Sequence, residues 1–281
     1  MNKPNTEIIP CPYCSSLEYK TWAIDNGFTA VQCNNCNLVY VNPRPLSSMI
    51  DEAVRTGTHS QEANSKNVIT RRIDSKVQIY RKIFNDIFSD VWQKQKTISW
   101  LDVGAGFGEI VEAISFVAPK GSNIQGLEPM KPKAEHARSR GLVIHDGYIE
   151  SVTEKFDVIS LVNVFSHIPD FRGFLKDAKG VLNKNGEIFI ETGNAAEFSR
   201  NKVPGEISLP DHLVFAGESH MRGFLEEAGF EVISIKKARI DTWFEFVKDI
   251  VKFIIRRPIV LSLPYTSPYR SLRIRARLSS K

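Results

Sequence analysis

The chain has 281 residues, enough for one large α/β domain with a small appendage, and hydrophobic residues make up 42% of it. It contains no run of about eighteen apolar residues, so we expect no membrane-spanning helix. The formal net charge of +5 is uneven, because residues 231–281 carry twelve Lys or Arg and four Asp or Glu. We expect a basic C-terminal extension over residues 241–281, which is either a solvated tail or a surface for an anionic substrate or a peripheral membrane contact.

Two Cys-x-x-Cys pairs stand near the N terminus and hold all 4 cysteines of the chain: Cys11, Cys14, Cys33 and Cys36. The residues between the pairs alternate as a short β-hairpin would. This spacing predicts a structural Zn²⁺ site of four thiolates in a zinc ribbon over residues 1–45. Disulfides or free thiols are the alternative. No signal peptide precedes the cysteines, so we expect a reducing, cytoplasmic location in which disulfides are disfavoured.

The next segment, residues 46–96, is expected to be a helical linker between the ribbon and a larger domain. Residues 51–64 are polar, contain Gly57 and are expected to form a loop. Beyond them, apolar residues recur at helical spacing from Ile69 to Val91. Most of these apolar side chains should pack against a sheet.

A strand, a glycine-rich turn and a helix come next. Residues 97–103 suit a buried strand, and residues 109–117 have one apolar helical face. Between them, Gly104, Gly106 and Gly108 are spaced G-x-G-x-G, whereas a dinucleotide-binding turn has G-x-G-x-x-G. Such a tight turn needs residues without Cβ, and the N–H groups that open the helix can face a carboxylate or phosphate. The alternative is an ordinary glycine-rich turn that binds no ligand.

Further apolar segments predict the remaining strands of a parallel sheet. They are residues 123–128, 142–144, 155–162 and the last part of 181–192. The first of them ends in Glu128, whose carboxylate either accepts hydrogen bonds from both hydroxyls of a ribose or is simply solvated. The order of these segments predicts an α/β fold with helices on both faces of the sheet.

The run Asp102-x-Gly-x-Gly-x-Gly, followed by an acid at the end of the next strand, resembles motif I of the class I S-adenosylmethionine-dependent methyltransferases. The resemblance covers about residues 100–235, with the segments in the family's order. It implies a Rossmann-like methyltransferase domain over residues 97–240 that binds S-adenosylmethionine, with residues 46–96 as a lid over the site. By this resemblance, the cofactor-binding residues are Asp102, Gly104, Ala105, Gly106, Gly108, Glu128, Tyr148, Ile149 and Asn163.

The segment Asn37–Pro45 resembles the sequence that joins a zinc ribbon to the methyltransferase domain in bacterial sugar C-methyltransferases and in surface-polysaccharide methyltransferases. Residues 267–277 resemble the tail of the same subgroup. This resemblance implies a small, oxygen-rich acceptor, such as a sugar in a nucleotide-linked or glycan precursor. Where these relatives have a His-Glu-His stretch, this chain has Pro210, Asp211 and His212, so the second histidine is retained.

Methyl transfer from a sulfonium is an in-line displacement, and a hydroxyl acceptor must also lose its proton. We expect His212 to be the general base, since an ordinary histidine pKa of about 6.5 suits that role at neutral pH. Asp211 is its candidate partner. His167, which follows the predicted fourth strand, is the second candidate, and His220 is a further histidine at the same end of the sheet. The alternative for His212 is that it only holds its loop.

Two other functions remain open from the sequence. Zinc ribbons also occur in rRNA- and tRNA-modifying methyltransferases, where the ribbon would bind RNA. Here, however, the ribbon has few basic residues, and no Asn-Pro-Pro-Tyr motif follows the fourth strand. A methyltransferase fold without activity could act as a binding protein, but the intact Asp102, Glu128 and glycines favour retained cofactor binding. We therefore expect a small-molecule or glycan-precursor acceptor rather than nucleic acid.

Overall fold

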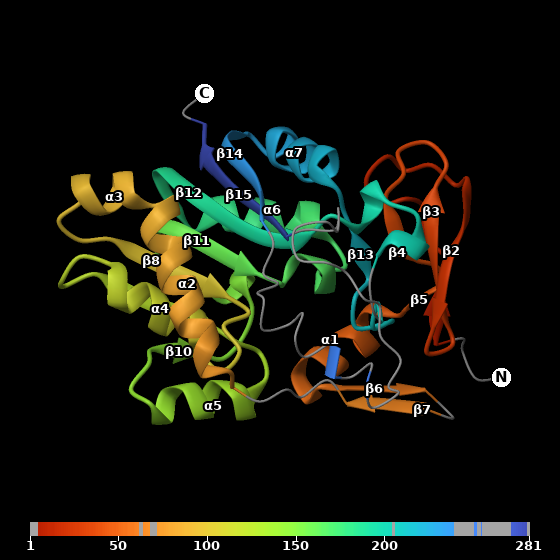
Figure 1. The fold of residues 1–281 in the computed structure, drawn as a ribbon, viewed down its shortest axis with the longest axis horizontal. Helices are drawn as coiled ribbons and strands as arrows, with labels where there is room; N and C mark the ends of the chain where they lie inside the picture. Colours follow the sequence, from red (N-terminus) through yellow and green to blue (C-terminus); the bar gives the residue numbers. More distant parts are fainter. Residues whose placement is uncertain are drawn as a thin grey trace.

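A seven-stranded sheet forms the centre of the computed structural model, which describes residues 5–61, 64–67, 72–203, 206–238, 250–251, 254 and 271–279 (Figure 1). In spatial order its strands are β10 (Ile144–His145), β9 (Asn123–Leu127), β8 (Ser99–Val103), β11 (Phe156–Val162), β12 (Leu182–Gly193), β15 (Ser271–Leu278) and β14 (Phe230–Ala238). The strands from β10 to β12 are parallel, and β15 lies antiparallel between β12 and β14. The carboxyl ends of the parallel strands therefore meet at one edge, where open α/β sheets bind their ligands.

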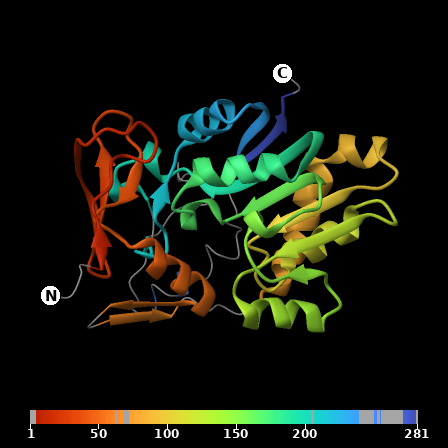
Figure 2. The same ribbon diagram turned by 180° about the vertical axis from the view of Figure 1, so that it is seen from behind.

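Helices cover both faces of this sheet, as the sequence predicted (Figures 1 and 2). The helices α2 (Asp74–Ile87), α3 (Ser89–Lys94) and α4 (Glu109–Val117) cover one face, α6 (Phe171–Gly180) and α7 (Glu218–Glu227) cover the other, and α5 (Lys131–Ser139) lies beside β10. Side chains alternate along β8, so Trp100 packs against Phe84 of α2, whereas Leu101 belongs to the opposite core with Leu175 of α6. Short 3₁₀ helices lie in the loops: η1 (Ile149–Ser151), η2 (Phe165–His167), η3 (Ala195–Glu197) and η4 (Arg200–Lys202).

The cysteine-containing segment forms a second, four-stranded sheet. Its order is β13 (Val214–Phe215), β4 (Val39–Val41), β3 (Phe28–Cys33) and β2 (Tyr19–Asp25), and a short pair of β1 (Thr6–Glu7) with β5 (Arg44–Pro45) lies beside it. The predicted hairpin corresponds to β2 and β3. The fourth strand, β13, comes from the part of the chain that follows β12, so the predicted ribbon of residues 1–45 shares its sheet with the larger domain.

The segment between the two sheets differs from its prediction in one place. Where a loop was expected over residues 51–64, the helix α1 (Ser47–Thr56) precedes a hairpin of β6 (Thr58–Gln61) and β7 (Asn64–Asn67). The helix buries only Ile50 and Ala53, which is too few apolar residues to give a clear periodicity, and Gly57 ends it with φ 72°. The helix predicted from the apolar spacing between Ile69 and Val91 is confirmed by α2, whereas Ile69 itself lies outside the described residues.

The strand β15 lies inside the main sheet, whereas the sequence predicted a basic extension beyond residue 240. Its basic residues alternate with apolar ones, which is a strand pattern. Arg273, Arg275 and Arg277 form ion pairs of 2.5–2.8 Å with Glu191 and Glu187. These three arginines thus pair with acidic residues of β12, and Arg275 is buried while Arg277 is exposed, whereas most of residues 241–270 lies outside the described residues. Within the described ranges, no helix has both the length and the apolar content needed to cross a membrane.

Candidate functional site

The glycine-rich turn connects the end of β8 to the start of α4, as predicted. Its glycines have φ values of 71° at Gly104, 56° at Gly106 and 84° at Gly108, a backbone conformation that residues with a side chain rarely adopt. A Cβ at Gly104 would lie 2.5 Å from Val164 Cγ2, and one at Gly108 would overlap Leu142, so protein packing excludes a side chain at both. A Cβ at Gly106 would have nothing within 4 Å among the described residues. Gly106 is therefore the point at which a ligand can approach the turn.

The carboxylate of Glu128 lies directly against this turn. The N–H of Gly106 donates to Glu128 Oε2 at 2.7 Å, and the N–H of Met130 donates to Oε1 at 2.9 Å. Glu128 is buried at the carboxyl end of β9, next to β8 in the sheet. The structure thus brings together Gly106 and Glu128, and it fixes an acceptor-only group where a nucleoside hydroxyl could donate.

Asp102 lies below the turn, inside the sheet, with 1% of its surface exposed. Its Oδ1 accepts a hydrogen bond of 2.5 Å from Ser160 Oγ in β11, and Trp100 Nε1 donates to the same Ser160 oxygen at 2.9 Å. Burial raises the pKa of Asp102 to about 7, although the Ser160 hydrogen bond opposes this shift. The contacts of Asp102 in the structure thus connect two neighbouring strands, and its role toward a cofactor stays a prediction.

The other predicted cofactor residues lie around the same edge of the sheet. Ala105 is buried within the turn, and Ile149 in η1 is buried in the core beside α6. Tyr148 is half-buried, and the guanidinium of Arg55 lies 5.6 Å from the centre of its ring. Asn163 is exposed after β11 with φ 59°, a conformation that asparagine tolerates better than most residues. Tyr148 and Asn163 are therefore accessible from outside, and Ile149 is mainly a packing residue.

One residue that the sequence did not single out lies close to the turn. Arg72 precedes α2, and its Nη2 donates to Glu112 of α4 at 2.6 Å, while the N–H of Ile73 donates to Glu109 Oε1 at 3.0 Å. The Nη1 atom of Arg72 is buried and has no hydrogen-bond partner among the described residues. An arginine in a polar stretch gives no sequence signal, and only the fold brings it to the first turns of α4.

The three predicted catalytic residues, His167, Asp211 and His212, come together in one cluster. His167 ends η2 after β11, and the other two precede β13. The two imidazole ring centres are 4.8 Å apart, and Asp211 Oδ1 lies 3.4 Å from His167 Nδ1, so the carboxylate lies against His167. The N–H of Leu213 donates to the carbonyl of Ser166 at 2.7 Å and holds the two loops together.

Hydrogen bonds to backbone carbonyls determine the tautomers of both histidines. His167 Nδ1 lies 2.7 Å from the carbonyl oxygen of Asp211, and His212 Nδ1 lies 3.0 Å from that of Ile207. A carbonyl only accepts, so each Nδ1 carries the hydrogen. In the neutral form each ring then has its lone pair on Nε2, which is the atom that can take a proton or bind a cation.

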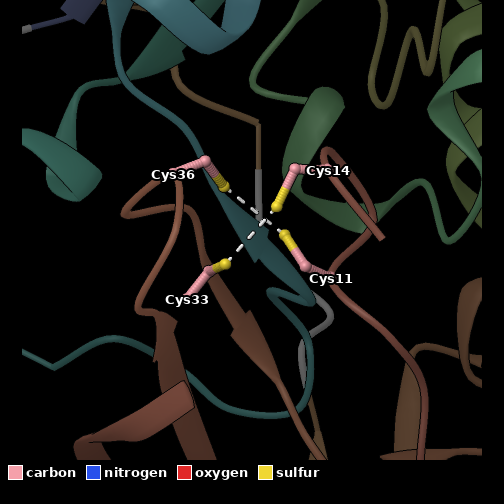
Figure 3. A group of neighbouring side chains, drawn as sticks. All are labelled: Cys11, Cys14, Cys33 and Cys36. Atoms are coloured by element: carbon pink, nitrogen blue, oxygen red, sulfur yellow. Dashed lines mark hydrogen bonds between the residues drawn. The ribbon is translucent and has the colours of Figure 1, made fainter. Parts of the chain in front are cut away.

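The four cysteines meet at one point, and their sulfur atoms face one another (Figure 3). The Sγ atoms of Cys11 and Cys36 are 3.5 Å apart, as are those of Cys14 and Cys33, and all four lie within 4.8 Å of one another. A disulfide needs about 2.05 Å, and all four cysteines are free. Zn–S bonds of about 2.3 Å in a tetrahedron put the sulfurs roughly 3.8 Å apart, so this donor set fits a zinc ion.

His220, the remaining histidine considered from the sequence, lies between α7 and the cysteines. Its Nδ1 accepts from the N–H of Gly217 at 3.1 Å, so its Nε2 carries the hydrogen and donates to the carbonyl of Cys36 at 2.8 Å. The ring is buried, which lowers its pKa, and it packs edge-on against Tyr13. Its contacts in the structure are therefore with the cysteine-containing segment, not with His167 or His212.

Comparisons with known proteins agree with this arrangement. A family model described as Methyltransferase domain matches residues 75–235. The ubiquinone biosynthesis O-methyltransferase of Actinobacillus pleuropneumoniae serotype 7 is 32% identical over 108 residues, which are 34% of this chain and 45% of that protein. The enzyme of the same name from Pseudomonas aeruginosa is 24% identical over 156 residues, or 48% of this chain and 65% of that protein. The chain thus matches about half the length of the first of these relatives and just under two thirds of the length of the second.

Two solved structures share the fold. Coclaurine N-methyltransferase bound to N-methylheliamine and SAH has a TM-score of 0.51 at 12% identity, covering 81% of this chain and 80% of that one. The cyclase SpnF has a TM-score of 0.51 at 15% identity, covering 70% and 80%. These likenesses concern the fold alone, but the matched family model covers more than half of the chain. Residues 75–235 are therefore a class I S-adenosylmethionine-dependent methyltransferase domain, and the chain belongs to that family.

Proposed function

We propose that this chain transfers the methyl group of S-adenosylmethionine to an oxygen atom of a small hydroxylated acceptor. One observation carries the proposal. The glycine turn with Glu128 and the cluster of His167 and His212 both follow the carboxyl ends of parallel strands of the same sheet. A cofactor at the turn and an acceptor at the cluster would thus lie along one edge of the sheet.

The cofactor-binding part of the proposal assigns a role to each contact at the turn. Glu128 would accept hydrogen bonds from the ribose hydroxyls, and the open side of Gly106 would admit the cofactor close to the backbone. The positively charged Arg72, with its buried Nη1, is suited to the methionine carboxylate beside the first turn of α4. Tyr148 and Asn163 would lie beside the adenine.

The chemical step needs a base at the acceptor. The bound cofactor supplies an electrophilic methyl group on a sulfonium sulfur. His212, with its lone pair on Nε2, would take the hydroxyl proton of the acceptor. The acceptor oxygen would then bond to the methyl carbon while the carbon–sulfur bond breaks, and the electron pair of that bond would remain on sulfur. His167 would position the acceptor or share the role of base.

Two lines of support bear on the acceptor: the first on the atom that is methylated, the second on the class of molecule. The relatives named ubiquinone biosynthesis O-methyltransferases transfer to oxygen by name. The segment Asn37–Pro45 resembles the sequence that follows the ribbon in sugar C-methyltransferases and in surface-polysaccharide methyltransferases, which favours a sugar as the acceptor molecule but does not specify the methylated atom. We favour a sugar in a nucleotide-linked or glycan precursor, because the ribbon belongs to the second resemblance. Within the proposal, a Zn²⁺ ion on the four cysteines has a structural role only.

The proposal is tested by incubating the full chain with isotopically labelled S-adenosylmethionine and two sets of acceptors. One set contains nucleotide-linked sugars and glycan precursors, and the other contains small phenols. Mass spectrometry should find a methylated sugar, and the His212→Gln variant should lose turnover by on the order of a hundredfold while its cofactor affinity persists. A methylated phenol would overturn the sugar assignment. No product from either set, with cofactor bound, would contradict the activity.

A further inference from the structure

The cluster of His167, Asp211 and His212 has a donor set that the methyl-transfer proposal does not use fully. We propose that it binds one divalent transition-metal ion through the two imidazoles and the Asp211 carboxylate. Each residue offers a ligand atom, and these atoms lie within 4.8 Å of one another. One ion at about 2.0–2.2 Å from each donor would span such a group.

The hydrogen bonds around the imidazoles have the arrangement found in metal sites. A histidine that binds a metal through one ring nitrogen usually donates the hydrogen of the other to a backbone carbonyl or carboxylate. Both rings here do so, His167 to the carbonyl of Asp211 at 2.7 Å and His212 to that of Ile207 at 3.0 Å. In the neutral form of each ring, Nε2 is therefore the nitrogen that would bind a cation.

The loops that carry these ligands are joined in advance of any ion. The N–H of Leu213 donates to the carbonyl of Ser166 at 2.7 Å, between the sequence neighbours of His212 and His167. The side chains of His167 and Asp211 are 27% and 23% exposed, so an ion can enter from solvent. A site that is already assembled loses little conformational freedom when it binds.

The donor set also selects the class of ion. Two imidazole nitrogens and one carboxylate suit Zn²⁺, Fe²⁺, Co²⁺ or Mn²⁺, whereas Mg²⁺ and Ca²⁺ prefer oxygen donors alone. Three protein ligands leave coordination positions open, unlike the four thiolates of the cysteine site. The two sites therefore differ in their donor atoms and in the number of positions left open.

The role of the ion rests on the proposed function, whereas its binding does not. An open position would take a hydroxyl oxygen of the acceptor and lower the pKa of that hydroxyl. With an ion bound, the proton would leave to solvent and His212 would serve as a ligand; without an ion, His212 keeps the role of base that the proposed function gives it. A sugar with two adjacent hydroxyls could occupy two open positions, which would also orient it.

The experiment measures metal binding without cofactor or acceptor. The full chain, with its cysteine site loaded with zinc, is titrated with Co²⁺ and, separately, with Mn²⁺. We expect one equivalent to bind, and the bound Co²⁺ should show ligand-field bands without the charge-transfer bands of thiolate ligation. Isothermal titration and elemental analysis give the stoichiometry, and a cobalt spectrum with thiolate bands only would overturn the site.

Variants then assign the ligands. His167→Gln, His212→Gln and Asp211→Asn should each weaken Co²⁺ binding by roughly tenfold or more, a loss of about 1.4 kcal/mol per factor of ten. His136→Gln, an exposed histidine on α5, serves as the control and should bind as the wild type does. Equal affinity in the double variant of His167 and His212 would overturn the proposal, and circular dichroism checks that the variants fold.

The outcomes separate this proposal from the methyltransferase function. Absence of a Co²⁺ or Mn²⁺ equivalent, together with methyl transfer that depends on His212, overturns the metal site and leaves the function standing. Binding at the cluster in a protein that methylates neither acceptor set supports the metal site and contradicts the function.

Discussion

The N–H of Val41 in β4 donates to the carbonyl of Leu213 at 2.8 Å, and Leu213 in turn donates its own N–H to Ser166 at 2.7 Å. One residue therefore connects the sheet that carries the cysteines to the loop that ends in His167. Val214, the next residue, pairs with Tyr40 in the same sheet. Backbone hydrogen bonds thus connect the cysteine-containing segment to the histidine cluster, so a loss of structure in the first should disturb the second.

This link leads to a prediction about metal removal. Protein purified without added zinc should contain about one tightly held equivalent on the four cysteines, since structural thiolate sites bind zinc strongly. Chelation of that zinc should lower the melting temperature and the rate of methyl transfer, because β4 and the Leu213 loop lose their support. Affinity for S-adenosylmethionine should change by no more than a few-fold, since the glycine turn follows β8 of the main sheet, whereas the cysteines belong to the segment that forms the other sheet. A metal-free protein with unchanged melting would contradict this.

His220 gives a second prediction about the same interface. His220→Ala removes the donor to Cys36 and the acceptor for Gly217, and it leaves both backbone groups unpaired in a buried place. We expect a loss of about 2 kcal/mol or more in the free energy of unfolding, measured by denaturant titration. The control is Arg222→Ala on the same helix, whose side chain is 44% exposed and forms surface ion pairs of 3.6–3.9 Å with described residues of that helix.

The control should cost less than about 0.5 kcal/mol, as surface ion pairs usually do. An equal effect of the two substitutions would show that His220 is not part of a stabilising contact between α7 and the cysteine-containing segment.

The parts of the fold that the sequence predicted are those that depend on local patterns. Five parallel strands, the glycine turn and the face of α4 follow from runs of apolar residues and from glycines at positive φ. The proximity of Gly106 and Glu128 could be predicted from the sequence, because one βαβ unit brings the carboxyl ends of successive strands together. The clustering of His167 with His212 agrees with the expectation that both loops lie at the carboxyl ends of the strands.

The parts that were missed depend on contacts between distant segments. Two residues, Val214 and Phe215, complete a sheet that begins near residue 19, and nothing in so short a run indicates its partner. In the main sheet, β15 buries Leu272, Ile274 and Ala276, and Arg273 and Arg275 pair with Glu191 and Glu187 of β12. The spacing of these residues does not reveal their partner strand. Arg72 likewise gains its neighbours only when α2 packs on α4.

The open side of Gly106 provides a prediction with a matched control. Gly106→Ala and Gly141→Ala each place a Cβ at a positive φ, 56° and 83°, with nothing within 4 Å among the described residues. Both should therefore cost about 1–2 kcal/mol of stability through backbone strain. Only Gly106→Ala should also weaken binding of S-adenosylmethionine, by roughly tenfold or more, because its methyl group would occupy the ligand's approach.

Isothermal titration of the two variants measures the difference, and Glu128→Ala is expected to weaken binding as well through loss of the acceptor for the ribose. If Gly106→Ala and Gly141→Ala bind the cofactor equally well, the cofactor does not lie against Gly106.

The buried carboxyl of Asp102 predicts a pH-dependent stability. Burial raises its pKa to about 7 in the folded protein, against an ordinary value of about 3.9 in the unfolded chain. Between these two pH values the folded state binds more protons than the unfolded state. The contribution of Asp102 to the free energy of unfolding is therefore full below about pH 4 and is lost as the pH rises through 7. Asp102→Asn removes the buried charge while its side-chain oxygen can still accept from Ser160.

The variant should therefore be more stable than the wild type at pH 8, and the advantage should shrink as the pH falls. For each pH unit below 7, protonation of Asp102 adds about 1.4 kcal/mol to the free energy of unfolding of the wild type. The difference in this free energy between variant and wild type should therefore decrease by roughly 2 kcal/mol from pH 8 to pH 5.5. Denaturant unfolding without cofactor at both pH values measures it, and the measurement at pH 5.5 serves as the internal control. A difference that does not vary with pH would mean that Asp102 stays ionised in the folded protein, and that its contact with Ser160 compensates for its burial.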